Sequence, residues 1–105
     1  MKITWSPLAA EQVRDIASYI ALDKHSVAEQ WIDKIFDSVE QLIDFPKSGR
    51  VVPELQINSI QELVQGNYRV IYKIQDNSIS VLSAEMFSIV NLVGNTGCKK
   101  LYTKV

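Results

Sequence analysis

The sequence predicts an α+β domain in which a two-helix hairpin packs on one face of an antiparallel sheet. Two patterns carry this prediction. Apolar residues recur at helical spacing between residues 8 and 43, and they alternate with polar residues in short runs from residue 60 onward. Helices that precede a run of strands favour one helical layer on one sheet. The length of 105 residues is that of one domain, so we expect a single domain over residues 1–105.

A short strand over residues 2–5 is followed by a helix that begins at Ser6-Pro7. Serine is a favoured N-cap, and proline fits the first helical position because its fixed φ suits the helix. The apolar positions that follow share one face as far as about Leu22: Leu8, Ala9, Val13, Ile16, Ala17 and Ile20.

A second helix is predicted between the polar join Asp23-Lys24-His25 and Pro46. Ser26 and Glu29 have the spacing of a capping box, and the residue before a proline is disfavoured in a helix. The apolar stripe of this helix contains Ala28, Ile32, Ile35, Val39 and Leu42, widened by Trp31, Phe36 and Ile43. We expect Trp31, like Trp5 of the first strand, to belong to the core.

Three strands joined as a meander complete the prediction. They are expected over residues 60–64, 68–75 and about 79–85, with tight turns at Gly66-Asn67 and Asp76-Asn77. The predicted fold is therefore strand, two-helix hairpin, then an antiparallel three-stranded meander, with the helices on one face of the sheet.

Composition narrows the classes of function. The net charge is −1 with only three arginines, which leans against an avid nucleic-acid binder. No apolar run approaches the roughly 20 residues that span a bilayer, so we expect no membrane contact. One cysteine, Cys98, cannot form an internal disulfide, which makes a cytoplasmic location the default expectation.

The sequence predicts no metal or cofactor and offers no conventional catalytic motif. His25 is the only histidine, and one histidine with one cysteine cannot complete a zinc site. At a polar join between helices, His25 is interpreted as an exposed loop residue. No glycine-rich phosphate loop and no nucleophile motif occur.

Five short motifs follow one another along the chain: W-S-P-x-A at Trp5 to Ala9, I-A-x-Y-I at Ile16 to Ile20, F-P-x-x-G-R at Phe45 to Arg50, V-P-E at Val52 to Glu54 and G-N-Y-R-V-I-Y at Gly66 to Tyr72. Taken together and in this order, they resemble the RelE/ParE superfamily of bacterial toxins over roughly residues 2–92. The V-P-E motif and the pair Glu62-Leu63 look more like the ParE branch. The segment from about residue 94 matches no pattern of this superfamily.

The resemblance implies the toxin of a type II toxin–antitoxin system, with a cognate antitoxin as partner. ParE-like members inhibit DNA gyrase by binding it, and RelE-like members cut mRNA on the ribosome. We expect the ParE-like activity, so that the chain performs no chemistry itself. Two alternatives stay open: a RelE-like ribosome-dependent endoribonuclease, and an inactive homologue that only binds an antitoxin.

The resemblance also selects candidate partner-binding residues. Arg69 falls where RelE-type nucleases use arginine to stabilise charge on the scissile phosphate, and alternation places it on the open side of the sheet. Gln61 and Met86 stand where ParE-like sequences often have arginine and histidine. The full set of candidates is Arg69, Arg50, Tyr68, Tyr72, Gln61, Met86 and Phe87.

Several of these residues have a second, structural interpretation. Arg69 either contacts a partner or makes a salt bridge to a surface acid, and Arg50 either orients its loop, for example through Glu54, or touches a partner. Tyr68 and Tyr72 are expected to bury their rings and leave their hydroxyls at the rim. The apolar run from Met86 to Val93 is either core or an exposed edge that an antitoxin would cover.

This chain lacks most of the catalytic side chains that the nuclease alternative requires. The arginine and tyrosine of active nucleases would lie within residues 85–93, where this chain reads EMFSIVNLV. Their lysines on the strand before the hairpin are replaced by Ile60 and Glu62. Cleavage needs a proton acceptor and a proton donor in reach, so the sequence disfavours ribonuclease activity.

Overall fold

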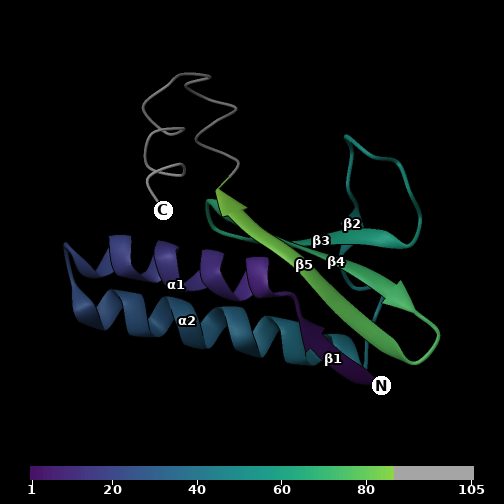
Figure 1. Cartoon of the computed structure of the whole chain (residues 1–105), viewed down its shortest axis with the longest axis horizontal. Coiled ribbons are helices and arrows are strands. Elements are labelled where there is room, and N and C mark those ends of the chain that lie inside the picture. The colour runs from purple at the N-terminus through teal and green to yellow at the C-terminus, as the bar shows by residue number, and fades with distance from the viewer. Residues whose placement is uncertain (87–105) are drawn as a thin grey trace.

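The computed structural model describes residues 1–86, which form one sheet with two helices on one of its faces (Figure 1). This arrangement confirms the predicted α+β class and the predicted order of elements. The elements are β1 (Lys2–Trp5), α1 (Pro7–Ala21), α2 (His25–Glu40), the 3-10 helix η1 (Gln41–Ile43), β2 (Arg50–Val51), β3 (Ile60–Gln65), β4 (Tyr68–Gln75) and β5 (Ser78–Met86).

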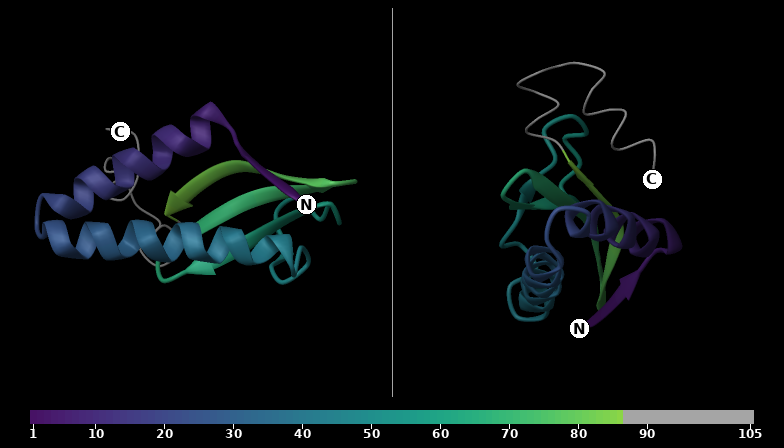
Figure 2. Two further views of the ribbon diagram at one scale, coloured as in Figure 1. Left: turned by 90° about the horizontal axis from the view of Figure 1, so that it is seen from below. Right: turned by 90° about the vertical axis from the view of Figure 1, so that its left-hand side faces the viewer.

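The sheet has five strands in the order β1-β5-β4-β3-β2, so the predicted meander β3-β4-β5 is its centre. At one edge, β1 pairs with β5 in parallel; at the other, β2 pairs with β3 antiparallel. The views in Figure 2 show both helices on the same side of this sheet. Strand β2 was not predicted, because two residues are too few to show an alternating pattern.

Ser6 caps α1 as predicted and also ties the helix to the sheet. Its Oγ accepts a hydrogen bond from the Ala9 amide at 2.9 Å and donates one to the Leu82 carbonyl at 2.9 Å. Leu82 is the extra residue of a β-bulge, because Ile71 pairs with Ser83 whereas Tyr72 pairs with Val81. The start of α1 is therefore fixed to the irregular point of β5.

The predicted capping box of the second helix is wrong. Helix α2 begins at His25 with Lys24 as its N-cap, and the Lys24 side chain makes no capping hydrogen bond. Ser26 consequently lies inside the first turn, where its backbone is helical and its hydroxyl cannot cap the helix. The end of the helical region at Ile43 agrees with the expected limit before Pro46.

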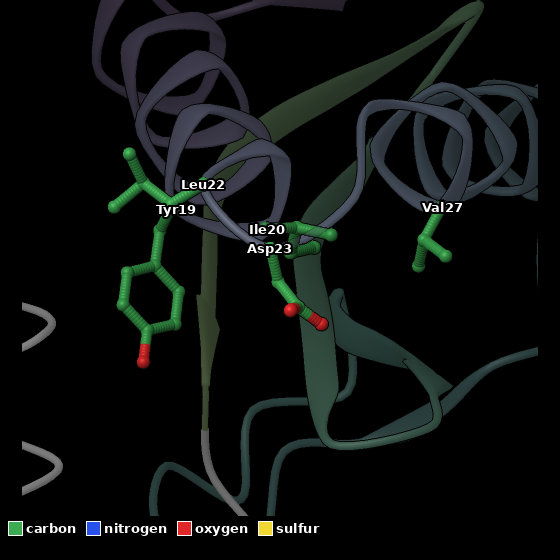
Figure 3. Close-up of a pocket in the computed structure, with 5 residues that line it drawn as sticks. All are labelled: Tyr19, Ile20, Leu22, Asp23 and Val27. Atoms are coloured by element: carbon green, nitrogen blue, oxygen red, sulfur yellow. The ribbon is translucent and has the colours of Figure 1, made fainter.

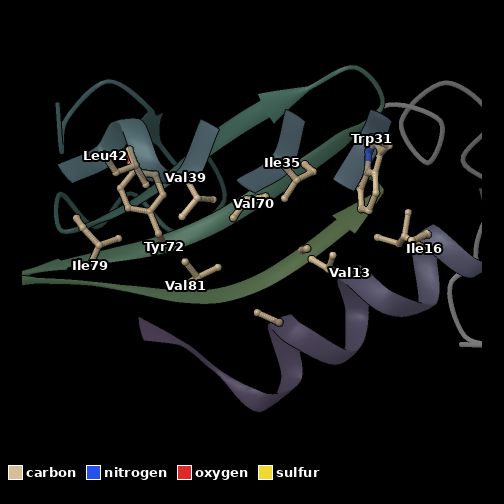
Figure 4. Close-up of a cluster of buried hydrophobic side chains, with 13 residues drawn as sticks. Val13, Ile16, Trp31, Ile35, Val39, Leu42, Val70, Tyr72, Ile79 and Val81 are labelled. Atoms are coloured by element: carbon tan, nitrogen blue, oxygen red, sulfur yellow. The ribbon is translucent and has the colours of Figure 1, made fainter. Parts of the chain in front are cut away.

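The core lies between the helical hairpin and the sheet (Figure 4). The most deeply buried members come from both layers: Ala9, Ile35, Val39, Leu42, Val70, Tyr72, Ile79, Val81 and Ala84. Trp31 is buried, and Trp5 packs at the margin of the core with its ring 5.1 Å from that of Phe36. Leu8, Phe36 and Ile43, which were predicted on the apolar stripes, are each more than 40% exposed because they lie on the flanks of the buried faces.

Candidate functional site

Arg69, the second residue of β4, is held by three carboxylates on the face of the sheet opposite the helices. Its neighbour Val70 points into the core, so alternation along the strand turns Arg69 to the other face, as predicted. The guanidinium lies 2.6 Å from Glu54, 2.9 Å from Glu62 and 2.7 Å from Glu85. Only 12% of the Arg69 side chain is exposed.

Glu62 joins a second arginine to this group. Its side chain is fully buried, and its Oε2 lies 2.6 Å from Nε of Arg50, whose side chain is 61% exposed. Glu62 thus bridges a covered guanidinium and an exposed one. We call Arg50, Glu54, Glu62, Arg69 and Glu85 the arginine–glutamate cluster.

In the arginine–glutamate cluster, Arg69 and Glu54 each stabilise the charged form of the other. Hydrogen bonds from Arg69 are the main reason that the pKa of Glu54 is lowered from its usual value. In return, the three carboxylates, Glu54 foremost, raise the pKa of Arg69 further. With three carboxylates and two guanidinium groups, the cluster carries an excess of negative charge.

Tyr72 forms a second centre of contacts on the core face of the same strand. The ring is fully buried, and the hydroxyl lies 2.9 Å from the Pro46 carbonyl and 3.0 Å from Oε1 of Gln61. The hydroxyl also accepts a hydrogen bond from the Gly49 amide at 3.1 Å. Burial raises the pKa of this phenol. The expectation that the Tyr72 hydroxyl lies at the rim is therefore wrong, because the chain around Pro46 and Gly49 covers it.

Gly49 is required at its position by the closeness of two neighbours. A Cβ atom there would lie 2.5 Å from the Glu62 carbonyl oxygen and 2.6 Å from the Tyr72 hydroxyl oxygen, both well inside van der Waals contact. The glycine of the F-P-x-x-G-R motif therefore allows the loop to lie directly on the tyrosine that ends Y-R-V-I-Y. These two motifs are one structural unit, although they are far apart in the chain.

Tyr68 and Met86 lie opposite each other at the end of the sheet, where β4 begins and β5 ends. The Tyr68 ring packs edge-on against Trp31, with the ring centroids 5.2 Å apart. Burial and, to a lesser degree, Tyr19 raise the pKa of the Tyr68 hydroxyl. Both Tyr68 and Met86 are partly exposed.

The predicted partner-binding residues therefore divide by accessibility. Arg50, Tyr68 and Met86 reach the surface. Arg69 is largely covered, and Gln61 and Tyr72 are buried. Phe87 lies outside the described residues.

Residues 3–84 match a protein family described as "ParE toxin of type II toxin-antitoxin system, parDE". The chain belongs to this family. The match covers most of the chain and includes all five motifs singled out above, so the predicted membership is confirmed, with the chain on the ParE side of the superfamily.

A solved structure described as "Chromosomal ParDE TA system from P. aeruginosa" contains a chain with the same fold. The TM-score is 0.67 with 18% identity, and the similarity covers 82% of this chain and 95% of that chain. The likeness supports the fold. A comparison with curated proteins gives no match. Membership of the family makes the chain a type II toxin, and this class of toxin implies an antitoxin as partner.

A hollow that the sequence analysis did not predict lies at the connected end of the helical hairpin (Figure 3). Its volume is about 520 Å³, and it is lined by Tyr19, Ile20, Leu22, Asp23 and Val27. The available signal was that apolar Leu22 and Val27 flank the polar join between the helices. We call this feature the hairpin hollow.

Residues 1–86 provide neither a metal site nor a membrane-spanning helix. Within this part of the chain, no group of three or more potential ligands could hold a metal ion. None of its helices combines the length and apolarity that crossing a membrane requires. His25 is exposed, as expected, but it is the first residue of α2 and not a loop residue.

Proposed function

We propose that this chain inhibits DNA gyrase by binding it, without covalent chemistry, and that a cognate antitoxin neutralises it by covering the same surface. The observation that carries this proposal is the arginine–glutamate cluster, in which Arg69 already has three carboxylate partners. The proposal rests on family membership for the class of toxin and on this geometry for the mode of action.

The cluster argues against a RelE-like nuclease. An arginine stabilises a phosphate when its guanidinium can make two charge-assisted hydrogen bonds to phosphate oxygens. Here Glu54, Glu62 and Glu85 use those donors, and their charge repels a phosphate. A nucleic acid would have to displace at least one of these ion pairs before it reached Arg69.

The accessible candidates suggest how the partner is held. We propose that Arg50, Tyr68 and Met86 contact the partner directly, and we keep Phe87, which follows Met86 in the sequence, as a further candidate contact. In this view Arg69, Gln61 and Tyr72 are positioning residues that fix the loop and strand carrying the contact groups. Arginine, aromatic and methionine side chains such as those of Arg50, Tyr68 and Met86 are enriched at protein–protein interfaces.

The test begins with purified chain and purified gyrase in a DNA supercoiling assay, followed by induction in bacteria. We expect inhibition of supercoiling, filamentation of the cells, intact transcripts, and rescue by a co-expressed antitoxin. Transcripts cut at codon positions in translating ribosomes would instead support the nuclease alternative. Normal growth with retained antitoxin binding would support the inactive homologue.

Arg50→Gln tests the proposed contact, and Arg14→Gln is its matched control on the exposed surface of α1. We expect Arg50→Gln to weaken inhibition at least tenfold, whereas Arg14→Gln leaves inhibition unchanged. The melting temperature of both variants must be measured, because Arg50 also contacts Glu62. Full inhibition by folded Arg50→Gln would remove Arg50 from the proposed interface.

A further inference from the structure

The segment from Phe45 to Arg50, which leads from η1 into β2, exposes three large side chains. It lies beyond the C-terminal end of α2, away from the join between the helices (Figure 2). Phe45 is 65% exposed, the Arg50 side chain is 61% exposed, and Lys47 between them is also exposed. We call residues 45–50 the basic loop. Packing of the core explains neither its phenylalanine nor its two cations, since none of the three belongs to the core cluster of residues 1–86.

The backbone of the basic loop is fixed, although its side chains are exposed. The Ser48 amide donates a hydrogen bond to the Phe45 carbonyl at 3.0 Å, which closes a tight turn. The Tyr72 hydroxyl contacts the Pro46 carbonyl at 2.9 Å and accepts a hydrogen bond from the Gly49 amide at 3.1 Å, so both sides of the turn are tied to β4. A surface that is already ordered loses little conformational entropy when it binds. The basic loop is therefore a preorganised surface.

The two arginines of the arginine–glutamate cluster differ in the hydrogen-bond donors that they leave for a partner. Every nitrogen of the Arg69 guanidinium contacts a carboxylate of the cluster. Arg50, in contrast, binds Glu62 through Nε. Within residues 1–86, no hydrogen bond or ion pair occupies either terminal nitrogen of Arg50. The exposed guanidinium therefore offers two adjacent donor groups to an oxyanion.

The charge of the basic loop favours an acidic partner. Residues 45–53 contain Lys47 and Arg50 and no acidic residue. The planar guanidinium of arginine matches the two oxygens of a carboxylate, which it binds through two parallel hydrogen bonds. The negative excess of the arginine–glutamate cluster repels the closely spaced charges of a nucleic acid more strongly than one carboxylate, because the repulsion grows with charge. A protein segment with few carboxylates therefore fits the loop better than a phosphate chain.

We infer that the basic loop binds a protein segment in which acidic and apolar residues are adjacent. One carboxylate of the partner takes the two terminal nitrogens of Arg50, a second lies near Lys47, and an apolar side chain packs on Phe45. Glu62 is a positioning residue of this site, because its buried carboxylate holds Nε of Arg50 while the rest of that guanidinium stays exposed. The inference rests on the proposed function, in which Arg50 contacts the partner, and adds the chemistry of the group that Arg50 binds.

A pair of short peptides tests the inference on the full chain. The probe is acetyl-Leu-Asp-Glu-Leu-amide, and its neutral match is acetyl-Leu-Asn-Gln-Leu-amide. Each is titrated into ¹⁵N-labelled protein, and the backbone amide shifts are followed by NMR. We expect the acidic peptide to shift the amides of residues 45–50 about fivefold more than those around Arg14, an exposed arginine of α1. Equal shifts at the two places, or equal shifts with the neutral peptide, would overturn the inference.

Arg50→Lys tests the two-pronged contact, and Arg14→Lys is its matched control. Lysine keeps the charge of arginine but cannot bind Glu62 and two carboxylate oxygens of a partner at once. We expect Arg50→Lys to weaken binding of the acidic peptide about fivefold and Arg14→Lys to leave it unchanged. Unchanged binding by Arg50→Lys would show that charge alone attracts the peptide and would overturn the proposed geometry.

Phe45→Ala tests the apolar contact, and Leu8→Ala is its control. Both side chains are more than half exposed, so both variants should fold. We expect Phe45→Ala to weaken binding of the acidic peptide about threefold, because the partner loses the apolar surface of the ring, and Leu8→Ala to have no effect. Equal affinities of the two variants would remove Phe45 from the site.

Two further measurements separate this inference from its alternatives. A short oligothymidylate, titrated under the same conditions, should shift residues 45–50 less than the acidic peptide does. Larger shifts with the oligonucleotide would overturn the acidic protein partner in favour of a nucleic acid. Inhibition of gyrase supercoiling is measured on the same protein. Inhibition without a selective peptide response would overturn this inference and leave the proposed function in place, whereas a selective response without inhibition would overturn only the gyrase proposal.

Discussion

Tyr72 and Arg69 lie on the same strand, and both hold the segment that precedes β3, but they do so by different physical means. On the core face, one neutral hydroxyl binds the backbone at Pro46 and Gly49. On the opposite face, one guanidinium binds carboxylates, including Glu54 in the connection between β2 and β3. The core contact depends on fit, whereas the outer contact depends on charge. Substitutions and pH should therefore affect the two faces differently.

The largest loss of stability should come from a substitution on the charged face. Arg69→Met keeps most of the apolar stem but leaves the buried Glu62 with Arg50 alone, and a buried charge that loses a partner costs roughly 3 kcal/mol. Urea unfolding should show this loss as a lower midpoint with an unchanged slope. Arg14→Met, on the exposed surface of α1, should stay within about 0.5 kcal/mol. A loss below about 1 kcal/mol would make Arg69 a surface ion pair and revive its interpretation as a direct partner contact.

The second largest loss of stability should come from the close contact of Gly49 with Tyr72 on the core face. Gly49→Ala places a methyl group against the Glu62 carbonyl and the Tyr72 hydroxyl, which should cost about 2 kcal/mol. Combining it with Tyr72→Phe removes one of the two clashes. The double variant should therefore lose less than the sum of the single losses, by at least about 0.5 kcal/mol in a double-mutant cycle. Strict additivity would mean that the loop moves away from β4 as a whole.

A somewhat smaller loss of unfolding free energy is expected for Tyr72→Phe alone. The change keeps the buried ring but leaves the Gly49 amide and the Pro46 carbonyl without their shared partner, at a cost of about 1.5 kcal/mol. Tyr19→Phe removes a hydroxyl from a ring that is 40% exposed and should be nearly neutral. Thermal unfolding of both variants measures the difference. Equal stabilities would show that water replaces the lost hydroxyl.

The smallest expected effect is a pH dependence of the unfolding free energy, which should appear on the charged face and not on the core face. The pKa of Glu54 is lowered by Arg69, so its contribution to stability is complete above the usual value of 4.5 and is lost as the pH falls through the lowered pKa. The difference in unfolding free energy between wild type and Glu54→Gln should stay constant from about pH 7 to 5 and shrink below 4.5. Because Glu54 is 57% exposed, the difference should remain below about 1 kcal/mol. Tyr72→Phe should show no change in this acid range, since its hydroxyl is neutral there.

The sequence predicted the elements well where the pattern was long enough to be read. The buried positions Ala9, Val13, Ile16 and Ala17 of α1, the Ser6 cap and the eight-residue strand β4 all follow from local rules. The two-residue strand β2 does not, because two residues are too few to show an alternating pattern. The predicted Ser26 cap is wrong, because α2 begins at His25 and Ser26 already lies within the helix.

The site was predicted less completely than the fold. Alternation placed Arg69 on the open face, but no local rule could show that Glu54, Glu62 and Glu85 converge on it from three other segments. In the same way, burial of Tyr72 depends on a loop that is more than twenty residues earlier in the chain. The motifs themselves were the available signal: the glycine, the glutamates and the arginines of the matched segments all meet at β4.

The position of β5 has a consequence for synthesis of the protein. It is the last strand described, yet it lies between β1 and β4, and Ser6 reaches across 76 residues to bind it. While the chain emerges from the ribosome, the first strand has no neighbour and α1 lacks its anchor. Pairing that waits for such distant residues is slow, because the intervening chain must first be ordered. Maturation of the toxin must therefore wait until β5 has been synthesised.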